Sequence, residues 1–175
     1  TELEGHPDNV AAAFYGGATI AWIEKSTNPT GESKNIGRAV SLKVDDRIKA
    51  LLLVPENQLS TAKARKLLPE SISHQDAVLN SSRTALLVHA LAERPDLLFT
   101  ATEDLLHQKY REEAMPKSIA LVEKLRGAGL AAVVSGAGPS VMVLYSGAED
   151  EIDQIQSVSP GFTAMKLAIA KTGVQ

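Results

Sequence analysis

A run of six small residues, Ser135 to Ser140, joins two apolar stretches in the last third of the chain. The stretches, Leu130 to Val134 and Val141 to Tyr145, are typical of β-strands, so the run between them predicts a hairpin turn. Glycine tolerates positive φ and lets a ligand or another backbone come close, while proline stiffens the turn. Hydroxyls and amides in such a turn suit an anion, although an ordinary Gly-Pro hairpin explains the same residues. The spacing is not that of a Walker A loop.

The apolar pattern around this turn predicts the order strand, helices, strand, strand, helix, strand. Ile48 to Val54 is nearly continuously apolar, Glu149 to Val158 is amphipathic, and Phe162 to Ala170 alternates. Capping-box spacing at Thr100 to Glu103 predicts a short helix through Leu106. The fold class is therefore α+β, with the βαββαβ order of a ferredoxin-like unit and extra helices in its first crossover.

A smaller piece with strands precedes this unit. Asn9 to Tyr15 predicts a helix that glycines end, and Ala18 to Glu24 and Arg38 to Val44 alternate as strands do. Residues 28–34 are polar and predict a loop. Trp22 is expected to be a core or strand-packing residue, without a functional role.

The clearest helix begins at Ser73, where capping-box spacing precedes an apolar pattern that extends to Leu91. Asp76, Asn80 and Arg83 share one stripe of this helix, which turns apolar beyond Arg83. A cation at the border of buried surface needs an anion. An internal salt bridge and a fork that binds a substrate carboxylate both satisfy this need, and the sequence leaves them open.

Charged and polar groups are concentrated at the start of the chain. A carboxylate there could bind Mg²⁺, and His6, Asp8 and Asn9 could hydrogen-bond a polar substrate. The same residues could merely cap and solvate a helix. Because the chain begins with Thr1-Glu2 rather than Met, we expect it to be part of a longer protein.

Composition narrows the classes of function. A formal net charge of −3 argues against a nucleic-acid partner, which usually meets a basic patch. The absence of cysteine excludes disulfides and thiolate metal sites and fits a reducing cytosol. No apolar run approaches the length of a membrane span, and no signal peptide is visible, so no membrane partner is expected.

Several segments, in order and at compatible spacing, carry a resemblance that covers essentially the whole chain. They are Glu4 to Ala12 followed by Gly16-Gly17, Leu68 to Ala77, Asn80 to Arg83, Arg94 to Leu98, Leu106 to Gln108 with Tyr110-Arg111, and Ser135 to Ser140. Together they resemble homoserine kinases of the actinobacterial type, which belong to the GHMP small-molecule kinases. The glycine turn resembles the third motif of that family.

The resemblance implies transfer of the γ-phosphoryl group of ATP, with Mg²⁺, to the hydroxyl of L-homoserine, on the way to threonine. It implies that residues 1–46 are a remnant of the GHMP N-terminal (S5-like) domain. Residues 47–175 would be the GHMP C-terminal ferredoxin-like domain. It further implies a cytoplasmic enzyme and is compatible with a homodimer.

The resemblance also implies roles for individual residues. Arg83 and Arg111 would bind the substrate carboxylate, which agrees with the independent expectation that Arg83 needs an anion. His6, Asp8 and Asn9 would line the amino-acid pocket. Asp8 and Asn9 are the candidate catalytic residues, and whether Asp8 takes the hydroxyl proton is left open.

The remaining roles concern the metal and the phosphates. Glu2 would bind Mg²⁺, with Glu4 as the alternative. The glycine turn would support the phosphate site from below. The residues in question are Ser135, Gly136, Ala137 and Gly138.

The sequence departs from the family pattern in one large respect. The family has an N-terminal substrate strand and a Gly-Ser-rich loop that wraps the ATP phosphates at a helix N-terminus, and neither is present. We therefore expect the C-terminal portion of a homoserine kinase, with little activity alone. The alternatives are another GHMP kinase, such as a mevalonate-type enzyme, and a non-catalytic ferredoxin-like binding domain.

Overall fold

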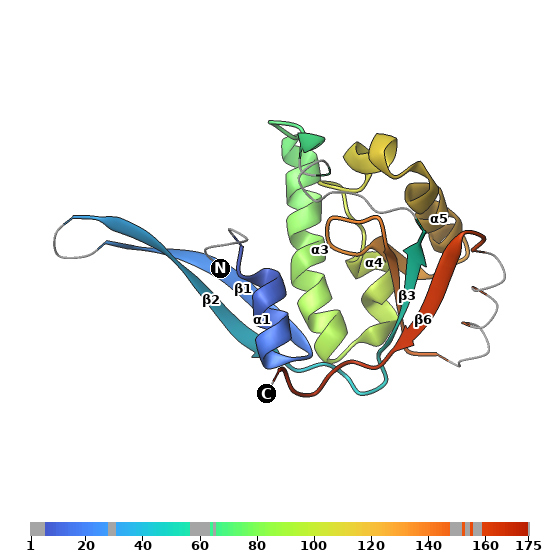
Figure 1. The fold of residues 1–175 in the computed structure, drawn as a ribbon, viewed down its shortest axis with the longest axis horizontal. Coiled ribbons are helices and arrows are strands. Elements are labelled where there is room, and N and C mark those ends of the chain that lie inside the picture. The colour runs from blue at the N-terminus through green and yellow to red at the C-terminus, as the bar shows by residue number, and fades with distance from the viewer. Residues whose placement is uncertain are drawn as a thin grey trace. The chain divides into compact units, whose positions relative to one another are not determined.

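A computed structural model describes residues 6–27, 31–56, 64, 66–147, 152, 155 and 159–174 of the chain. Its elements divide into two compact units (Figure 1). Unit 1 comprises Thr1–Val44 and Ile169–Gln175, and unit 2 comprises Asp45–Ala168. The resemblance predicts a division after residue 46, whereas unit 1 ends at Val44 and also includes the last seven residues of the chain.

Unit 1 combines one short helix with a two-stranded antiparallel sheet. The helix α1 spans Asp8–Tyr15, and the strands β1 and β2 span Ala18–Thr27 and Ser33–Leu42. Gly16 ends α1 with a φ of 73°, as the sequence predicts, because only glycine adopts such a conformation without strain. Both predicted strands are present and longer than expected, since β2 begins inside the polar stretch predicted to be a loop.

The last segment of the chain returns to unit 1. The N–H of Val174 donates to the carbonyl of Ala13 at 2.9 Å, which satisfies an acceptor near the end of α1. A Cβ on Gly173 would lie 1.9 Å from the carbonyl oxygen of Phe14, so this backbone-to-backbone contact requires glycine.

Unit 2 is built on a four-stranded antiparallel sheet. Its strands are β3 (Lys49–Pro55), β4 (Ala131–Val134), β5 (Val141–Tyr145) and β6 (Phe162–Leu167). Their order across the sheet is β4-β5-β3-β6, and every neighbouring pair is antiparallel. This is the order that a βαββαβ split unit produces, so the predicted α+β, ferredoxin-like class is confirmed.

The described helices of unit 2 lie in the crossover between β3 and β4. The long helix α3 spans His74–Ala92, and Ser73 caps it by accepting the N–H of Asp76 at 3.0 Å, as the capping-box spacing predicts. The other helices are η1 (Pro95–Leu97), α4 (Leu98–Ala101), η2 (Lys109–Ala114) and α5 (Pro116–Gly127). The predicted amphipathic helix at residues 149–158 lies mostly outside the described residues.

The prediction of a short helix from Thr100 to Leu106 is wrong. The helix α4 has already ended at Ala101, and residues 103–108 form an irregular segment that leads into η2. We call residues 103–109, which include the first residue of η2, the connecting segment. The capping-box spacing does not produce a helix here, because Glu103 binds Arg83 of α3 and not the backbone at the start of a helix.

The core of unit 2 lies between the sheet and α5. Alternate residues of β3 and β5 point into it, and Leu53, Val141 and Val143 are completely buried. Each such side chain contributes about 1.5–3 kcal/mol when it leaves water. On α5, Ser118 donates to the carbonyl of Pro139 at 2.6 Å, so the helix also holds the glycine turn, Ser135 to Ser140. No helix among the described residues is long and apolar enough to cross a membrane.

We predict that Gly138→Ala destabilises the protein by about 1–3 kcal/mol, because it strains the backbone and overpacks the core. Gly138 has a φ of 86°, and a Cβ there would lie 2.6 Å from the Sδ of Met115. Urea unfolding followed by circular dichroism measures the change. The control is Gly129→Ala, where φ is 85° and nothing lies within 4 Å of the added Cβ. Equal stability of the two variants would contradict the role of the close contact.

Candidate functional site

The residues predicted to form the site are divided between the two units. His6, Asp8 and Asn9 belong to unit 1, whereas Arg83, Arg111 and the glycine turn belong to unit 2. Within unit 2, Arg111 contacts the glycine turn directly, whereas Arg83 contacts Glu103. The two groups are therefore described one after the other.

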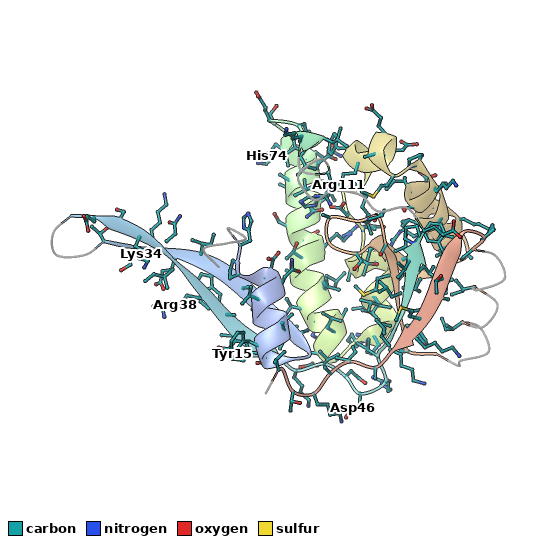
Figure 2. The ribbon with its side chains drawn as sticks, viewed as in Figure 1. Tyr15, Lys34, Arg38, Asp46, His74 and Arg111 are labelled. Atoms are coloured by element: carbon teal, nitrogen blue, oxygen red, sulfur yellow. The ribbon has the colours of Figure 1, made fainter. Side chains whose placement is uncertain are left out.

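Arg111 is anchored to the glycine turn. It lies in η2, its exposed fraction is only 7%, and its Nη1 donates to the carbonyl of Gly136 at 3.1 Å. Figure 2 labels this side chain. A buried guanidinium must be matched by acceptors, because an unmatched buried charge is very costly. The structure thus brings together Arg111 and the turn, two features that the sequence predicted as parts of one site.

Arg83 forms an ion pair within unit 2. Its Nε donates to Oε2 of Glu103 at 2.6 Å, and the two side chains are 26% and 39% exposed. This is the internal salt bridge that the sequence left open as one of two alternatives. A guanidinium carries five N–H donors, so one bond at Nε does not exhaust its capacity for an anion.

The whole polar stripe of α3 binds the connecting segment. Asp76 accepts from Nζ of Lys109 at 3.4 Å, and Asn80 accepts the N–H of Leu105 at 3.0 Å, next to the ion pair of Arg83. The connecting segment runs antiparallel to α3. Asp76, the first residue of the stripe, contacts Lys109 at the end of the segment, and Arg83, the last, contacts Glu103 at its start. The stripe therefore fixes the path of the chain that leads to Arg111.

Asp104 organises the connecting segment internally. Its carboxylate accepts the backbone N–H groups of Leu106, His107 and Gln108, and it lies 2.9 Å from Nδ1 of His107. Burial works to raise the pKa of Asp104. The hydrogen bonds from His107 and from the backbone outweigh this effect, and the net pKa lies below its usual value. The charged form of Asp104 is therefore part of the folded structure.

Gln108 links the connecting segment to the sheet. Its Oε1 accepts the N–H of Val134 at 2.8 Å, and Val134 is the last residue of β4 before the glycine turn. Two contacts thus connect this part of the chain to the β4–β5 hairpin: Gln108 of the connecting segment binds Val134 just before the turn, and Arg111 of η2 binds Gly136 within the turn. Asp104 and Gln108 were not predicted from the sequence to have a role in the site. The Asp-x-x-His spacing, which is typical of a side chain that caps its own turn, was the available signal for Asp104.

The glycine turn is held by its own backbone. The N–H of Ser135 donates to the carbonyl of Ser140 at 2.8 Å, and the N–H of Gly138 donates to the carbonyl of Ser135 at 3.0 Å. Gly136 and Gly138 have φ values of 59° and 86°. Two of the amides that could face an anion are thus used inside the turn, so its shape is preset by the chain itself.

The predicted residues of unit 1 lie at the start of α1. Asp8 is its first residue and accepts the N–H of Asn9 through Oδ1 at 3.0 Å. His6, Asp8 and Asn9 are all exposed. A carboxylate in the first turn is stabilised by the helix dipole, so this local arrangement also fits the structural alternative, a helix start.

The residues predicted to bind Mg²⁺ are two glutamates near the start of the chain. Glu2 and the alternative Glu4 lie outside the described residues. Within the described ranges, no three His, Cys, Asp or Glu side chains are grouped so that they could hold a metal ion.

Comparison with known proteins connects this arrangement to a family. Residues 82–159, which include Arg83, Arg111 and the glycine turn, match the family model described as GHMP kinases C terminal. The protein named homoserine kinase from Streptomyces coelicolor is 46% identical over 174 residues. The chain is a homologue of homoserine kinases.

Other relatives of the same name agree. The homoserine kinase of Leifsonia xyli subsp. xyli is 54% identical over 145 residues, which is 83% of this chain and 42% of that protein. The homoserine kinase of Mycobacterium tuberculosis is 45% identical over 98% of this chain. The resemblance recognised from the motifs is confirmed, and the matching model is that of a C-terminal domain, as predicted.

The chain spans about half the length of the curated relatives it matches. It aligns over 99% of its own residues with the Streptomyces coelicolor protein but covers 53% of that protein. The crystal structure of homoserine kinase from Cytophaga hutchinsonii superposes with a TM-score of 0.72 over 95% of this chain and 53% of that one. At 22% identity, this similarity supports the fold alone.

The lowered pKa of Asp104 predicts a pH-dependent loss of stability in Asp104→Asn. At neutral pH the variant should unfold more easily by about 1–2 kcal/mol, because it loses a charged acceptor. A lowered folded-state pKa contributes stability above the unfolded value of about 3.9 and loses it as the pH falls through the folded value. The difference between the two proteins should therefore be constant from about pH 7 to 5 and shrink below about pH 4.

Urea unfolding between pH 3 and 7 measures this difference. Glu113→Gln, which changes an exposed carboxylate on η2, is the control and should change the unfolding free energy by less than about 0.5 kcal/mol. A deficit of Asp104→Asn that is as large at pH 3 as at pH 7 would show that the charge of Asp104 has no such role.

Proposed function

We propose that this chain is the part of an ATP-dependent kinase that binds L-homoserine and positions its hydroxyl for phosphorylation to O-phospho-L-homoserine. The observation that carries the proposal is the 45–54% identity with proteins named homoserine kinase. The reaction belongs to threonine biosynthesis, and the enzyme would work in the cytoplasm with ATP and Mg²⁺. A homodimer is compatible with this proposal.

The carboxylate of homoserine is assigned to Arg83 and Arg111. The anchoring of Arg111 to the carbonyl of Gly136 supports this assignment, because it holds one guanidinium in a fixed place beside the turn. Arg83 keeps donors beyond the Nε that binds Glu103. Guanidinium groups bind carboxylates with paired, directional hydrogen bonds, so two of them would fix the orientation of a small amino acid.

The glycine turn is assigned to the phosphate side of the site. Ser135, Gly136, Ala137 and Gly138 carry no large side chain, and positive φ values at both glycines let the backbone pass close to a ligand. Since two of its amides bind within the turn, it would act as a rigid floor rather than as the main phosphate loop. Phosphoryl transfer demands mostly positioning and charge stabilisation, which a preset floor can serve.

The residues at the start of α1 complete the proposed assignment. His6, Asp8 and Asn9 would line the amino-acid pocket, with Asp8 and Asn9 nearest to the reacting hydroxyl. We assign no general base, since the hydrogen bond of Asp8 in the structure is to the neighbouring Asn9. Mg²⁺ would neutralise charge on the nucleotide, and its assignment to Glu2, or alternatively Glu4, rests on the family resemblance alone.

The assignment of Arg83 predicts that Arg83→Ala weakens homoserine binding by about 1.5–3 kcal/mol, the value of a charge-assisted hydrogen bond. Isothermal titration calorimetry with L-homoserine measures the affinity. Glu103→Gln is the matched control: it breaks the same internal ion pair but keeps the guanidinium, so its affinity should not fall.

The two variants separate the functional and structural explanations of Arg83. If Arg83 serves only the salt bridge, both variants lose the same stability and neither changes the affinity for homoserine. An absence of heat from homoserine, nucleotide and Mg²⁺ with the unmodified chain would instead favour a non-catalytic binding domain. A panel of small alcohols, including mevalonate, distinguishes another kinase of the same family.

The chain alone should turn over little substrate. It contains no Gly-Ser-rich loop of the kind that wraps ATP phosphates at a helix N-terminus, so the nucleotide would be held weakly. An ADP-coupled assay with homoserine checks this expectation. Robust turnover by the isolated 175-residue chain would overturn it.

A further inference from the structure

The ion pair between Arg83 and Glu103 is joined by a single hydrogen bond. The Nε of Arg83 donates to Oε2 of Glu103 at 2.6 Å, and among the described contacts no second bond joins these two side chains. Arg94 and Asp96, in contrast, form a fork, in which Nε donates to Oδ1 at 2.8 Å and Nη2 donates to Oδ2 at 2.7 Å. A fork of two parallel N–H groups is the stronger and more directional arrangement. Glu103 therefore uses the guanidinium of Arg83 less fully than a small free carboxylate could.

The side chain of Glu103 can leave Arg83 without displacing the backbone around it. Thr102, the preceding residue, is buried, and its hydroxyl donates to a backbone carbonyl of α4 at 2.8 Å. On the other side, the N–H of Leu105 donates to Asn80 of α3 at 3.0 Å. The side chain of Glu103 itself is 39% exposed. Ion pairs with this much exposure contribute little to stability, so another carboxylate can replace Glu103 at small cost.

A second guanidinium contacts the residue before Glu103. Nη1 of Arg126, on α5, donates to the hydroxyl of Thr102 at 3.1 Å, and Nη2 donates to the carbonyl of Phe99 at 2.8 Å. These acceptors are neutral, and the guanidinium also lies 4.5 Å from the centre of the Phe99 ring. Burial lowers the pKa of Arg126, and the negative charge of Glu103 partly opposes this effect. A carboxylate that leaves Arg83 would thus balance a partly buried cation.

Substrate binding would change the balance of charge at this place. The proposed function assigns the carboxylate of homoserine to Arg83, whose Nε donates to Glu103. Two carboxylates on one guanidinium repel each other unless a further cation balances one of them. α4 packs against α3 (Figure 1), and Arg126 of α5 binds the end of α4, so cations from two helices act on Glu103. Rotation of one side chain would therefore change its partner.

We propose that Glu103 is an internal competitor of the substrate: the carboxylates of Glu103 and of L-homoserine bind Arg83 in turn, and Glu103 turns toward Arg126 when homoserine is bound. The inference rests on the proposed function, since it takes the substrate carboxylate to Arg83. It goes further in making the affinity for homoserine depend on a residue that the substrate replaces rather than contacts.

The affinity for L-homoserine tests the competition. Glu103→Gln removes the charge of the competitor, so L-homoserine should bind about three- to fivefold more tightly in isothermal titration calorimetry, which is the effect of an ion pair of this exposure. Glu113→Gln is the matched control. It removes an equal charge from an exposed side chain of η2 and should change the affinity by less than about twofold, because solvent and salt screen that charge.

The Nε–H signal of Arg83 in nuclear magnetic resonance shows which carboxylate is bound. Without homoserine, the signals of the unmodified ¹⁵N-labelled chain and of Glu103→Gln should differ, because an amide replaces a charged acceptor. At saturating L-homoserine the two signals should converge, because the substrate carboxylate then takes the place of residue 103 in both proteins. The difference would persist if homoserine used only the Nη groups of Arg83.

Arg126 variants test the second position of Glu103. Arg126→Gln should weaken homoserine binding about three- to fivefold in the otherwise unmodified chain, because Glu103 then has no second cation to balance it. The same change should have no effect in the Glu103→Gln background, whereas a purely structural role of Arg126 would weaken binding equally in both backgrounds. Arg126→Lys keeps the charge and should restore the affinity. Circular dichroism of each variant checks that its fold is intact.

Two results would overturn this proposal and leave the proposed function intact. The first is an unchanged affinity of Glu103→Gln for homoserine while Arg83→Ala weakens binding. The second is a pair of Arg83 signals that remain separate at saturation. Failure of the proposed function gives a different result: Arg83→Ala then binds homoserine like the unmodified chain, or neither binds it, and both proposals are wrong.

Discussion

The contact between Arg111 and the carbonyl of Gly136 is the interaction on which the arrangement of unit 2 depends. A guanidinium stays charged, so its burial to 7% exposure is costly unless its surroundings supply acceptors, and the glycine turn supplies one at 3.1 Å. The turn can do so because its own backbone bonds already set its shape. One long-range contact thus ties the helical crossover to the β4–β5 hairpin.

The connecting segment leads to Arg111, and two sets of polar groups hold the segment in place. From outside, the stripe of α3 binds it through Asp76, Asn80 and Arg83. Within the segment, the carboxylate of Asp104 accepts hydrogen bonds from three backbone N–H groups and lies 2.9 Å from Nδ1 of His107. Irregular backbone near a core must satisfy its hydrogen-bonding groups in some such way. The result is a rigid support for a cation, which is what recognition of a small carboxylate requires.

Much of the fold could be predicted from the sequence because the signals were local. Apolar runs and their order gave the ferredoxin-like sheet, and the spacing after Ser73 gave the start of α3. The incorrect or incomplete predictions concern residues whose contact partners are distant in the sequence. Glu103 binds Arg83, twenty residues away, instead of capping a helix, and the sequence could say that Arg83 needs an anion but not which one. Trp22, expected to be a core or strand-packing residue, lies on β1 and is 42% exposed, so it is not part of a core in unit 1.

Arg111, which donates to the carbonyl of Gly136, is proposed to bind the carboxylate of homoserine, and the glycine turn is proposed to lie on the phosphate side of the same site. Nuclear magnetic resonance of the ¹⁵N-labelled chain tests it most directly, through the Nε–H signal of Arg111 and the amide signal of Gly136 during titration. The account predicts that L-homoserine shifts both signals, whereas L-homoserinol, in which a hydroxymethyl group replaces the carboxylate, shifts neither. Equal responses to the two compounds, or no response to homoserine, would contradict it.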